Sequence, residues 1–244
     1  ELVMAIIYNQ ETGEFHLYND GISYIMKILR NGQMGQLYFG KKVPAEQSYS
    51  YLEEHTKRST LSEVYENQYG FSLEQIRQEY PSYGTTDYRL PAVEIAQENG
   101  SRITNFTYVS HRIYAGKPGL PGLPATYVEK DQEADTLEIL LRDELIGVEM
   151  TLLYTIFTEE NAVARSVKFR NYKNEKLQIE TAMSLSLDLP DADYDWIQFS
   201  GAWSRERHVK ERRLQQGVQS VGSLRGASSH VHNPFVVLER RTAG

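Results

Sequence analysis

The chain has 244 residues, a formal net charge of −7 and no cysteine. The acidic excess argues against a nucleic-acid partner, because lysine and arginine are needed to neutralise phosphates. The lack of cysteine excludes disulfides and thiolate metal ligands and favours a reducing compartment. Neither a signal-peptide pattern nor a membrane-spanning apolar run is present in the sequence. We therefore expect a cytoplasmic protein with neither a membrane nor a nucleic-acid partner.

The first half of the chain contains short strand-like segments separated by hairpin turns of the Asn-Gly type. A polar, tyrosine-rich stretch over residues 44–70 is only weakly patterned, and a loop of that length is expected to be either disordered or functional. Ser72-Leu-Glu-Gln75 has the form of a capping box, which predicts one short helix over residues 72–79. The expected strands are residues 14–18, 23–29 and 36–39.

The second half shows strand periodicity more clearly. Polar and apolar residues alternate from Leu177 to Asp188, as in a strand with one buried face. With the strand-like runs before it, this segment predicts a meander of a sandwich or barrel. A last strand-like segment, residues 234–238, would leave an unpaired sheet edge, so we expect an incomplete C-terminal end or a missing partner. The runs before Leu177 are residues 137–141, 146–157 and 163–169.

The segment Gly201-Ala-Trp-Ser-Arg-Glu-Arg-His208 is the most informative part of the chain. An indole can stack on the apolar face of a sugar, while guanidinium groups and carboxylates bind its hydroxyls. On a regular strand Trp203, Arg205 and Arg207 would share one face, with Glu206 on the other. The alternative is a solvated charged segment with one buried tryptophan. We favour a loop that faces a ligand.

Two patterns could suggest a metal site, and neither is complete. His230 and His232 stand two residues apart, but zinc needs a third ligand that the neighbouring sequence does not supply. An Asp-x-Asp-x-Asp run starts at Asp191, but a calcium loop requires glutamate at the twelfth position, where Ala202 stands. We expect no metal and no cofactor, and hydrogen-bonding roles for the histidines.

Several further motifs follow one another along the chain, and together they closely resemble the amino-terminal region of bacterial α-galactosidases of glycoside hydrolase family 36. The resemblance runs from about Met4 to the end of the chain. The motifs are Tyr80-Pro-Ser-Tyr-Gly84, His111-Arg-Ile-Tyr-Ala-Gly-Lys-Pro118, Gly122-Leu-Pro-Ala-Thr-Tyr127, the Gly201–His208 segment and Gly226-Ala-Ser-Ser-His-Val-His-Asn-Pro-Phe235.

The resemblance implies an all-β fold, a large antiparallel β-supersandwich over residues 4–244 with one short helix and long loops. In the complete enzyme this domain precedes a (β/α)8 catalytic barrel, which is absent from this chain. The family hydrolyses terminal α-galactosyl units of melibiose and raffinose with retention, using two aspartates of the barrel. No residue of this chain is therefore expected to be catalytic.

The resemblance also implies contacts with sugar. Loops of this domain approach an active-site mouth in tetrameric relatives, so Trp203 would form an aromatic wall, supported by Arg205, Glu206 and Arg207. An acidic contact from the early loop would fall near Glu53 or Glu54. The expected partners are an α-galactoside oligosaccharide, the enzyme's own barrel and other copies in a homotetramer.

Two other functions stay open. The first is a free-standing galactoside-binding module without catalysis. The second is an aldose-epimerase-like enzyme, which needs a His and Glu acid–base pair. His208 with Glu206 is the tight pairing that the sequence offers for it.

Overall fold

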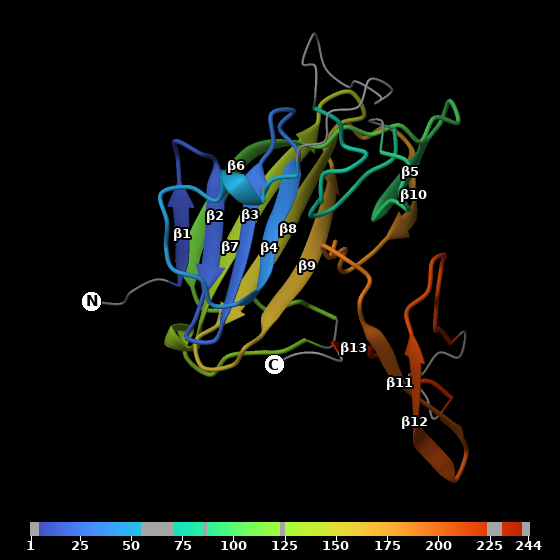
Figure 1. Ribbon diagram of the computed structural model, residues 1–244. Coiled ribbons are helices and arrows are strands. Elements are labelled where there is room, and N and C mark those ends of the chain that lie inside the picture. Colours follow the sequence, from blue (N-terminus) through green and yellow to red (C-terminus); the bar gives the residue numbers. More distant parts are fainter. Residues whose placement is uncertain (1–4, 55–70, 85–86, 123–124, 224–230, 241–244) are drawn as a thin grey trace. The chain divides into compact units, whose positions relative to one another are not determined.

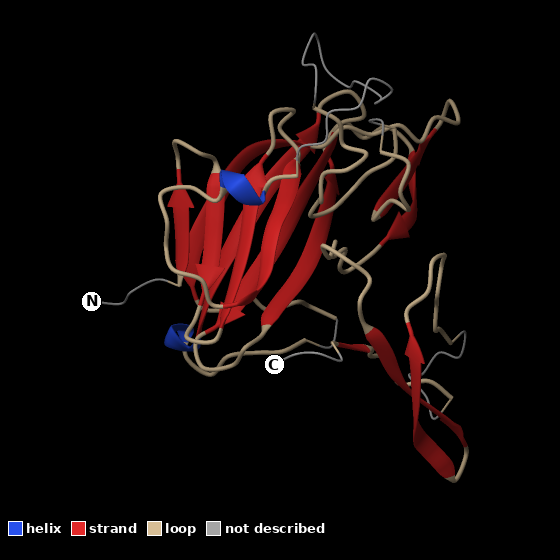
Figure 2. Cartoon of the chain, in the orientation of Figure 1, coloured by secondary structure: helices blue, strands red, loops and turns tan. Residues whose placement is uncertain are grey.

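The computed structural model describes residues 5–54, 71–84, 87–122, 125–223 and 231–240. The chain divides into two compact units, Glu1–Asp188 and Leu189–Gly244. Strands dominate both units (Figure 2), which confirms the predicted all-β, antiparallel class. Within the described ranges, no helix is long and apolar enough to cross a membrane.

The first unit contains two four-stranded antiparallel meanders that form a β-sandwich (Figure 1). The first sheet has the order β1-β2-β3-β4 and the second β6-β7-β8-β9. The strands predicted in these regions are confirmed, with ends that move by a few residues. Their bounds are β1 Ile6–Asn9, β2 Glu14–Tyr18, β3 Ile22–Ile28, β4 Met34–Lys41, β6 Thr107–Ala115, β7 Ala134–Asp143, β8 Val148–Phe157 and β9 Val163–Asn171.

Alternating apolar residues of the two sheets form the core of the sandwich. Because side chains alternate across a strand, β2 buries Phe15 and Leu17 in the core and turns Glu14 and His16 to the outer face. The outer face is not left to solvent, since Tyr49 packs there against Ile25 and Leu37. From β7 and β8 the core receives Leu137, Ile139, Leu141, Val148, Met150, Leu152, Tyr154 and Ile156.

A two-stranded ribbon, β5 (Val93–Gln97) with β10 (Leu177–Ala182), completes the regular structure of this unit. The strand predicted over residues 177–188 therefore ends at Ala182. Beyond it, Met183 N still donates to the Ala92 carbonyl oxygen at 2.9 Å, and side chains hold carbonyl oxygens of the segment. Arg165 Nη1 donates to the Ser186 carbonyl oxygen at 2.7 Å, and the Tyr80 hydroxyl donates to that of Met183.

The helix predicted over residues 72–79 is wrong. Gln36 N donates to the Arg77 carbonyl oxygen at 2.9 Å, and Glu79 N donates to that of Met34 at 3.0 Å. The edge strand β4 thus takes the backbone groups that a helix would pair internally. Among the described residues, the helical elements are instead the short 3-10 turns η1 (Ser50–Leu52) and η2 (Asp131–Glu133).

The second unit is a three-stranded antiparallel sheet in the order β12-β11-β13. β11 (Asp195–Ala202) and β12 (Arg205–Arg213) form a long hairpin, and β13 (Val237–Glu239) pairs with the start of β11. The strand predicted over residues 234–238 is thereby found, shifted by a few residues. The Gly201–His208 segment spans the closed end of the hairpin.

Candidate functional site at the tip of the β11–β12 hairpin

Trp203 and Ser204 form the two-residue turn that joins β11 to β12. Ala202 pairs with Arg205 across this turn, and Ser204 adopts the left-handed backbone conformation with φ 63°. Trp203 has no positive φ, so the turn follows the type II pattern, with its positive φ at the second central residue. The Trp203 side chain is consequently 80% exposed. Its indole is available to a flat ligand surface.

A β-bulge follows the turn directly. Ser200 pairs with His208 while Ala202 pairs with Arg205, so two residues of β12 oppose Gly201 alone. The extra residue is accommodated by Arg207, whose φ is 61°. The predicted regular alternation of Trp203, Arg205 and Arg207 is therefore wrong, because a bulge re-aims the side chains that follow it.

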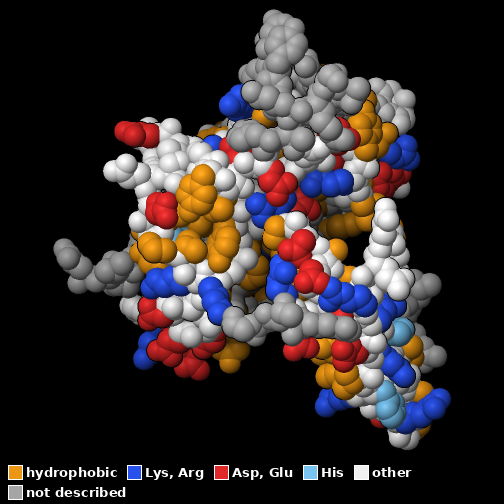
Figure 3. Space-filling view, in the orientation of Figure 1, with side chains coloured by type: hydrophobic (Ala, Val, Ile, Leu, Met, Phe, Trp, Pro, Cys, Tyr) orange, Lys and Arg blue, Asp and Glu red, His pale blue; other side chains and the backbone are white. Residues whose placement is uncertain are grey.

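The polar side chains of the tip are held locally. Glu206 Oε1 accepts a hydrogen bond from the Ser204 backbone N at 2.9 Å, which places a carboxylate beside the turn. Arg205, Glu206 and Arg207 are all exposed. Strand β12 carries five cationic and two acidic side chains, and Figure 3 shows Lys, Arg and His gathered over this hairpin. The tip thus presents an indole next to guanidinium groups and one carboxylate.

The base of the hairpin is fixed by arginine contacts with the Asp-rich run. Arg213 pairs with Asp193 and lies 3.5 Å from Asp195. Arg240 Nη2 donates to Asp191 Oδ2 at 2.9 Å and stacks over the Tyr194 ring. These aspartates are engaged in ion pairs with arginines at the base of the hairpin. In the described part of the chain, no group of three or more His, Asp or Glu could hold a metal ion.

Of the two histidines of the His-x-His pattern, the structure describes His232. His232 forms an isolated bridge with Ser200, next to the hairpin. His230 lies outside the described residues. The bulge at Arg207 lies between Glu206 and His208, so these two side chains do not follow the regular alternation of a strand.

Glu53 and Glu54 belong to the first unit, at the end of η1. The Glu53 side chain is only 6% exposed and its Oε2 lies 2.8 Å from Lys27 Nζ. Glu54 is more exposed, with Oε1 3.5 Å from Arg77 Nε. Glu54 is therefore better placed than Glu53 to reach a ligand. Residues 55–70, which follow them in the chain, lie outside the described residues.

Sequence reasoning missed a buried polar cluster in the first unit. Glu79 is completely buried and accepts hydrogen bonds from the hydroxyls of Tyr24 and Tyr154 at 2.8 Å each. Burial raises the pKa of Glu79, while Arg165 and the two hydroxyls oppose that rise. No sequence signal links these residues, since they come from separate strands and a loop.

Known proteins match this chain over most of its length. The family model described as the glycosyl hydrolase family 36 N-terminal domain matches residues 32–244. The chain belongs to this family. The α-galactosidase AgaA of Geobacillus stearothermophilus is 46% identical over 98% of this chain and 33% of its own length.

Solved family 36 structures share the fold as well as the sequence. The crystal structure of AgaB from Geobacillus stearothermophilus superposes with a TM-score of 0.90 at 46% identity, covering 98% of this chain and 32% of that one. The α-galactosidase of Lactobacillus brevis has a TM-score of 0.93 at 41% identity, covering 97% and 32%. The chain therefore spans about a third of the length of these family 36 relatives.

Proposed function

We propose that this chain is the non-catalytic amino-terminal portion of an α-galactosidase. The whole enzyme would hydrolyse terminal α-D-galactosyl residues of melibiose- and raffinose-type oligosaccharides with retention. The similarity to AgaA supports this proposal, since crystal structures of AgaA variants hold raffinose and stachyose. The two catalytic carboxyl groups would belong to a (β/α)8 barrel outside residues 1–244.

In this proposal the β11–β12 hairpin contributes to the sugar pocket. The observation that carries it is the 80% exposed indole of Trp203, held at a tight turn beside Arg205, Glu206 and Arg207. A large aromatic side chain left in solvent is typical of a surface that meets a ligand or another chain. The indole would stack on a galactosyl ring, and the charged groups would bind its hydroxyls or a neighbouring subunit.

Glu54 is a second proposed sugar contact, with Glu53 beside it. A carboxylate can accept hydrogen bonds from two sugar hydroxyls. Glu54 has about half of its side chain exposed. Glu53 is engaged with Lys27, so its contribution would be to position this segment.

The reaction itself is tested by incubating the whole protein with melibiose and following the released galactose by proton NMR. Retention predicts that α-galactose appears first and then mutarotates. Release of β-galactose first, or no hydrolysis of melibiose and raffinose, would contradict the proposal. Residues 1–244 alone should not hydrolyse either sugar, and calorimetry should find weak or no binding, because an isolated wall is not a pocket. Micromolar affinity would favour a galactoside-binding module.

We further propose that the enzyme is a cytoplasmic homotetramer. The apolar face of the second unit supports an assembly contact, since Val209, Phe235 and Val237 are each more than a third exposed. A three-stranded sheet of this size gains stability when such a face is covered. Light scattering on the whole protein measures the mass directly, and a monomer at micromolar concentration would contradict this part.

A further inference from the structure

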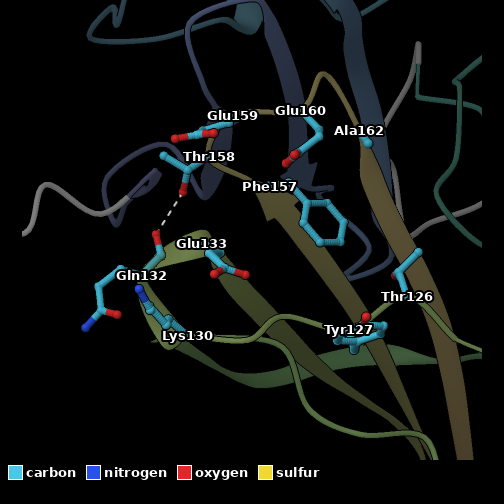
Figure 4. Close-up of a pocket in the computed structure, with 10 residues that line it drawn as sticks. All are labelled: Thr126, Tyr127, Lys130, Gln132, Glu133, Phe157, Thr158, Glu159, Glu160 and Ala162. Atoms are coloured by element: carbon cyan, nitrogen blue, oxygen red, sulfur yellow. Dashed lines mark hydrogen bonds between the residues drawn. The ribbon is translucent and has the colours of Figure 1, made fainter.

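One end of the sandwich contains an open hollow of about 690 Å³. Its walls come from the turn after β8, from η2 and from the segment that precedes η2. In Figure 4 the Phe157 ring and Tyr127 lie on one side, Lys130 and Gln132 on the opposite side, and Glu133 between them. A hollow of this volume is within the range of small-molecule sites, and large enough for two or three sugar rings.

The walls of the hollow are held in place by hydrogen bonds to their backbone carbonyl oxygens. The buried Asn19 side-chain amide donates to the carbonyl oxygens of Phe157 and Glu160, at 3.0 and 2.9 Å. Thr158 N donates to the Glu133 carbonyl oxygen at 2.9 Å, and Thr158 Oγ1 donates to that of Gln132 at 3.1 Å. The β8–β9 turn and η2 are thus tied to each other and to the first sheet. A preformed site of this kind loses little conformational entropy on binding.

The lining combines aromatic rings with uncharged and acidic hydrogen-bonding groups. Tyr127 is 78% exposed and Phe157 is half-buried, so both rings border the hollow without filling it. Three of its lining residues are glutamates and one is a lysine. Glu133 Oε2 accepts a hydrogen bond from the Glu129 N at 2.9 Å, which orients this carboxylate. Its second oxygen is geometrically able to accept from a ligand.

From these observations we propose that the hollow binds a neutral oligosaccharide of two or three units, without catalysis. Tyr127 would stack on the apolar face of one ring. The Glu133 carboxylate would accept hydrogen bonds from ring hydroxyls, and Lys130 and Gln132 would donate to hydroxyl oxygens on the opposite side. The proposal rests on the hollow alone and is independent of the hairpin and of the hydrolytic reaction.

Other ligand classes fit this lining less well. Anions such as phosphates meet three carboxylates against one ammonium group, so their binding would be repulsive. Aliphatic ligands would leave the polar wall without hydrogen bonds. A cationic peptide would suit the carboxylates but would face Lys130 across the hollow. A sugar uses the aromatic and the polar walls together.

The test uses the whole protein with fluorotyrosine in place of tyrosine, observed by fluorine NMR. The Tyr127 signal is assigned from its loss in Tyr127→Phe, and the signal of Tyr88, which is 76% exposed, serves as the matched control. Maltotriose and sucrose are the neutral probes, because neither carries the α-galactosyl unit that the enzyme is proposed to hydrolyse, and trilysine is the cationic probe. We expect maltotriose to shift the Tyr127 signal with half-saturation at about 1 mM, as befits an open site, and to leave the Tyr88 signal unchanged.

Substitutions in the wall give the second readout. Glu133→Gln should raise the half-saturating maltotriose concentration by about three- to tenfold, because a charged acceptor is replaced by a neutral one. Glu129→Gln is the matched control, because it changes a nearby glutamate that does not line the hollow. This variant should leave the half-saturating concentration unchanged. The proposal is overturned if neither sugar moves the Tyr127 signal up to about 20 mM. It is equally overturned if Tyr88 moves in parallel, if trilysine alone gives a shift, or if Glu133→Gln binds as the unaltered protein does.

Discussion

Arg165 Nη2 lies 3.1 Å from Glu79 Oε2 in the interior of the sandwich, where the arginine side chain is 8% exposed and the glutamate is fully buried. The same guanidinium donates to the hydroxyls of Tyr24 and Tyr154 and to the Glu79 carbonyl oxygen. These contacts connect β3, β8 and β9 with the segment before β5. A buried ion pair is tolerated when all its groups find partners, and is costly to leave half-made.

Removing either member of this pair should destabilise the fold strongly. We expect Arg165→Met and Glu79→Gln each to lower the free energy of unfolding by about 3 kcal/mol, because each leaves a buried partner unsatisfied. The double variant should lose clearly less than the sum of the two. Urea denaturation of the unaltered protein, the two single variants and the double variant gives the double-mutant cycle. Additive losses of stability would show that the two side chains do not act together.

The His16 ring predicts a pH dependence of stability. It is buried, its Nδ1 lies 2.9 Å from the Tyr49 hydroxyl and its Nε2 lies 2.8 Å from Ser23 Oγ. Burial, aided by the charge of Lys42, lowers the pKa of His16 from 6.5 to about 4. Between these two pH values the unfolded chain binds a proton that the folded chain does not. Stability should therefore fall as the pH drops from about 6.5 to 4, by at most about 3 kcal/mol.

Substitution of the ring isolates this effect. His16→Gln should flatten the stability profile in that pH window, measured by urea denaturation at several pH values. The exposed His208 is the matched control, and His208→Gln should keep the original slope. A His16→Gln profile with an unaltered slope would assign the pH dependence to other groups.

The sequence predicted the sandwich well because its strands follow local rules. β2 was predicted with its observed ends, since a hairpin turn follows it and its apolar and polar residues alternate. The helix predicted over residues 72–79 was wrong. Its capping-box pattern is a local signal, whereas the backbone of this segment forms hydrogen bonds with β4. The Glu79 cluster and the Tyr127 hollow had no signal, since both bring together residues that are distant in the chain.

The candidate site at the hairpin tip was predicted in part. Its residue types indicated a sugar-facing loop, and the exposed Trp203 agrees with that interpretation. Its geometry was not predictable, because the bulge depends on a positive φ at Arg207, a conformation that arginine rarely adopts. Whether Glu53 and Glu54 contact sugar stays a prediction.

The positive φ of Arg207 in the bulge predicts how substitutions at this position affect stability. Arg207→Gly should leave the hairpin intact or stabilise it slightly, because glycine adopts φ near 60° without strain. Arg207→Val should destabilise it by about 1–2 kcal/mol, since a β-branched residue is strained there. Thermal unfolding compares the two, and equal melting temperatures would show that the positive φ is not kept. If the guanidinium binds sugar, Arg207→Gly should also raise KM.

Variants of the Glu53–Lys27 ion pair can distinguish a structural role of Glu53 from a direct contact with the sugar. If Glu53 acts by positioning the segment, Glu53→Gln and Lys27→Met should lower stability by similar amounts, about 1 kcal/mol. Both should then have similar kcat/KM for raffinose. A loss of kcat/KM confined to Glu53→Gln would instead indicate a direct contact with the sugar. Glu54→Gln tests the more exposed neighbour in the same assay.

The most direct measurement is the kcat/KM of the whole enzyme for raffinose after Trp203→Ala, with Trp203→Phe as the ring-preserving control and Tyr88→Ala as the exposed-tyrosine control. We expect a loss of transition-state stabilisation of about 1–3 kcal/mol for Trp203→Ala, a smaller loss for Trp203→Phe and none for Tyr88→Ala, all with unchanged melting temperatures. An unchanged kcat/KM in Trp203→Ala would show that the indole does not touch the sugar, and would contradict the proposed role of the hairpin.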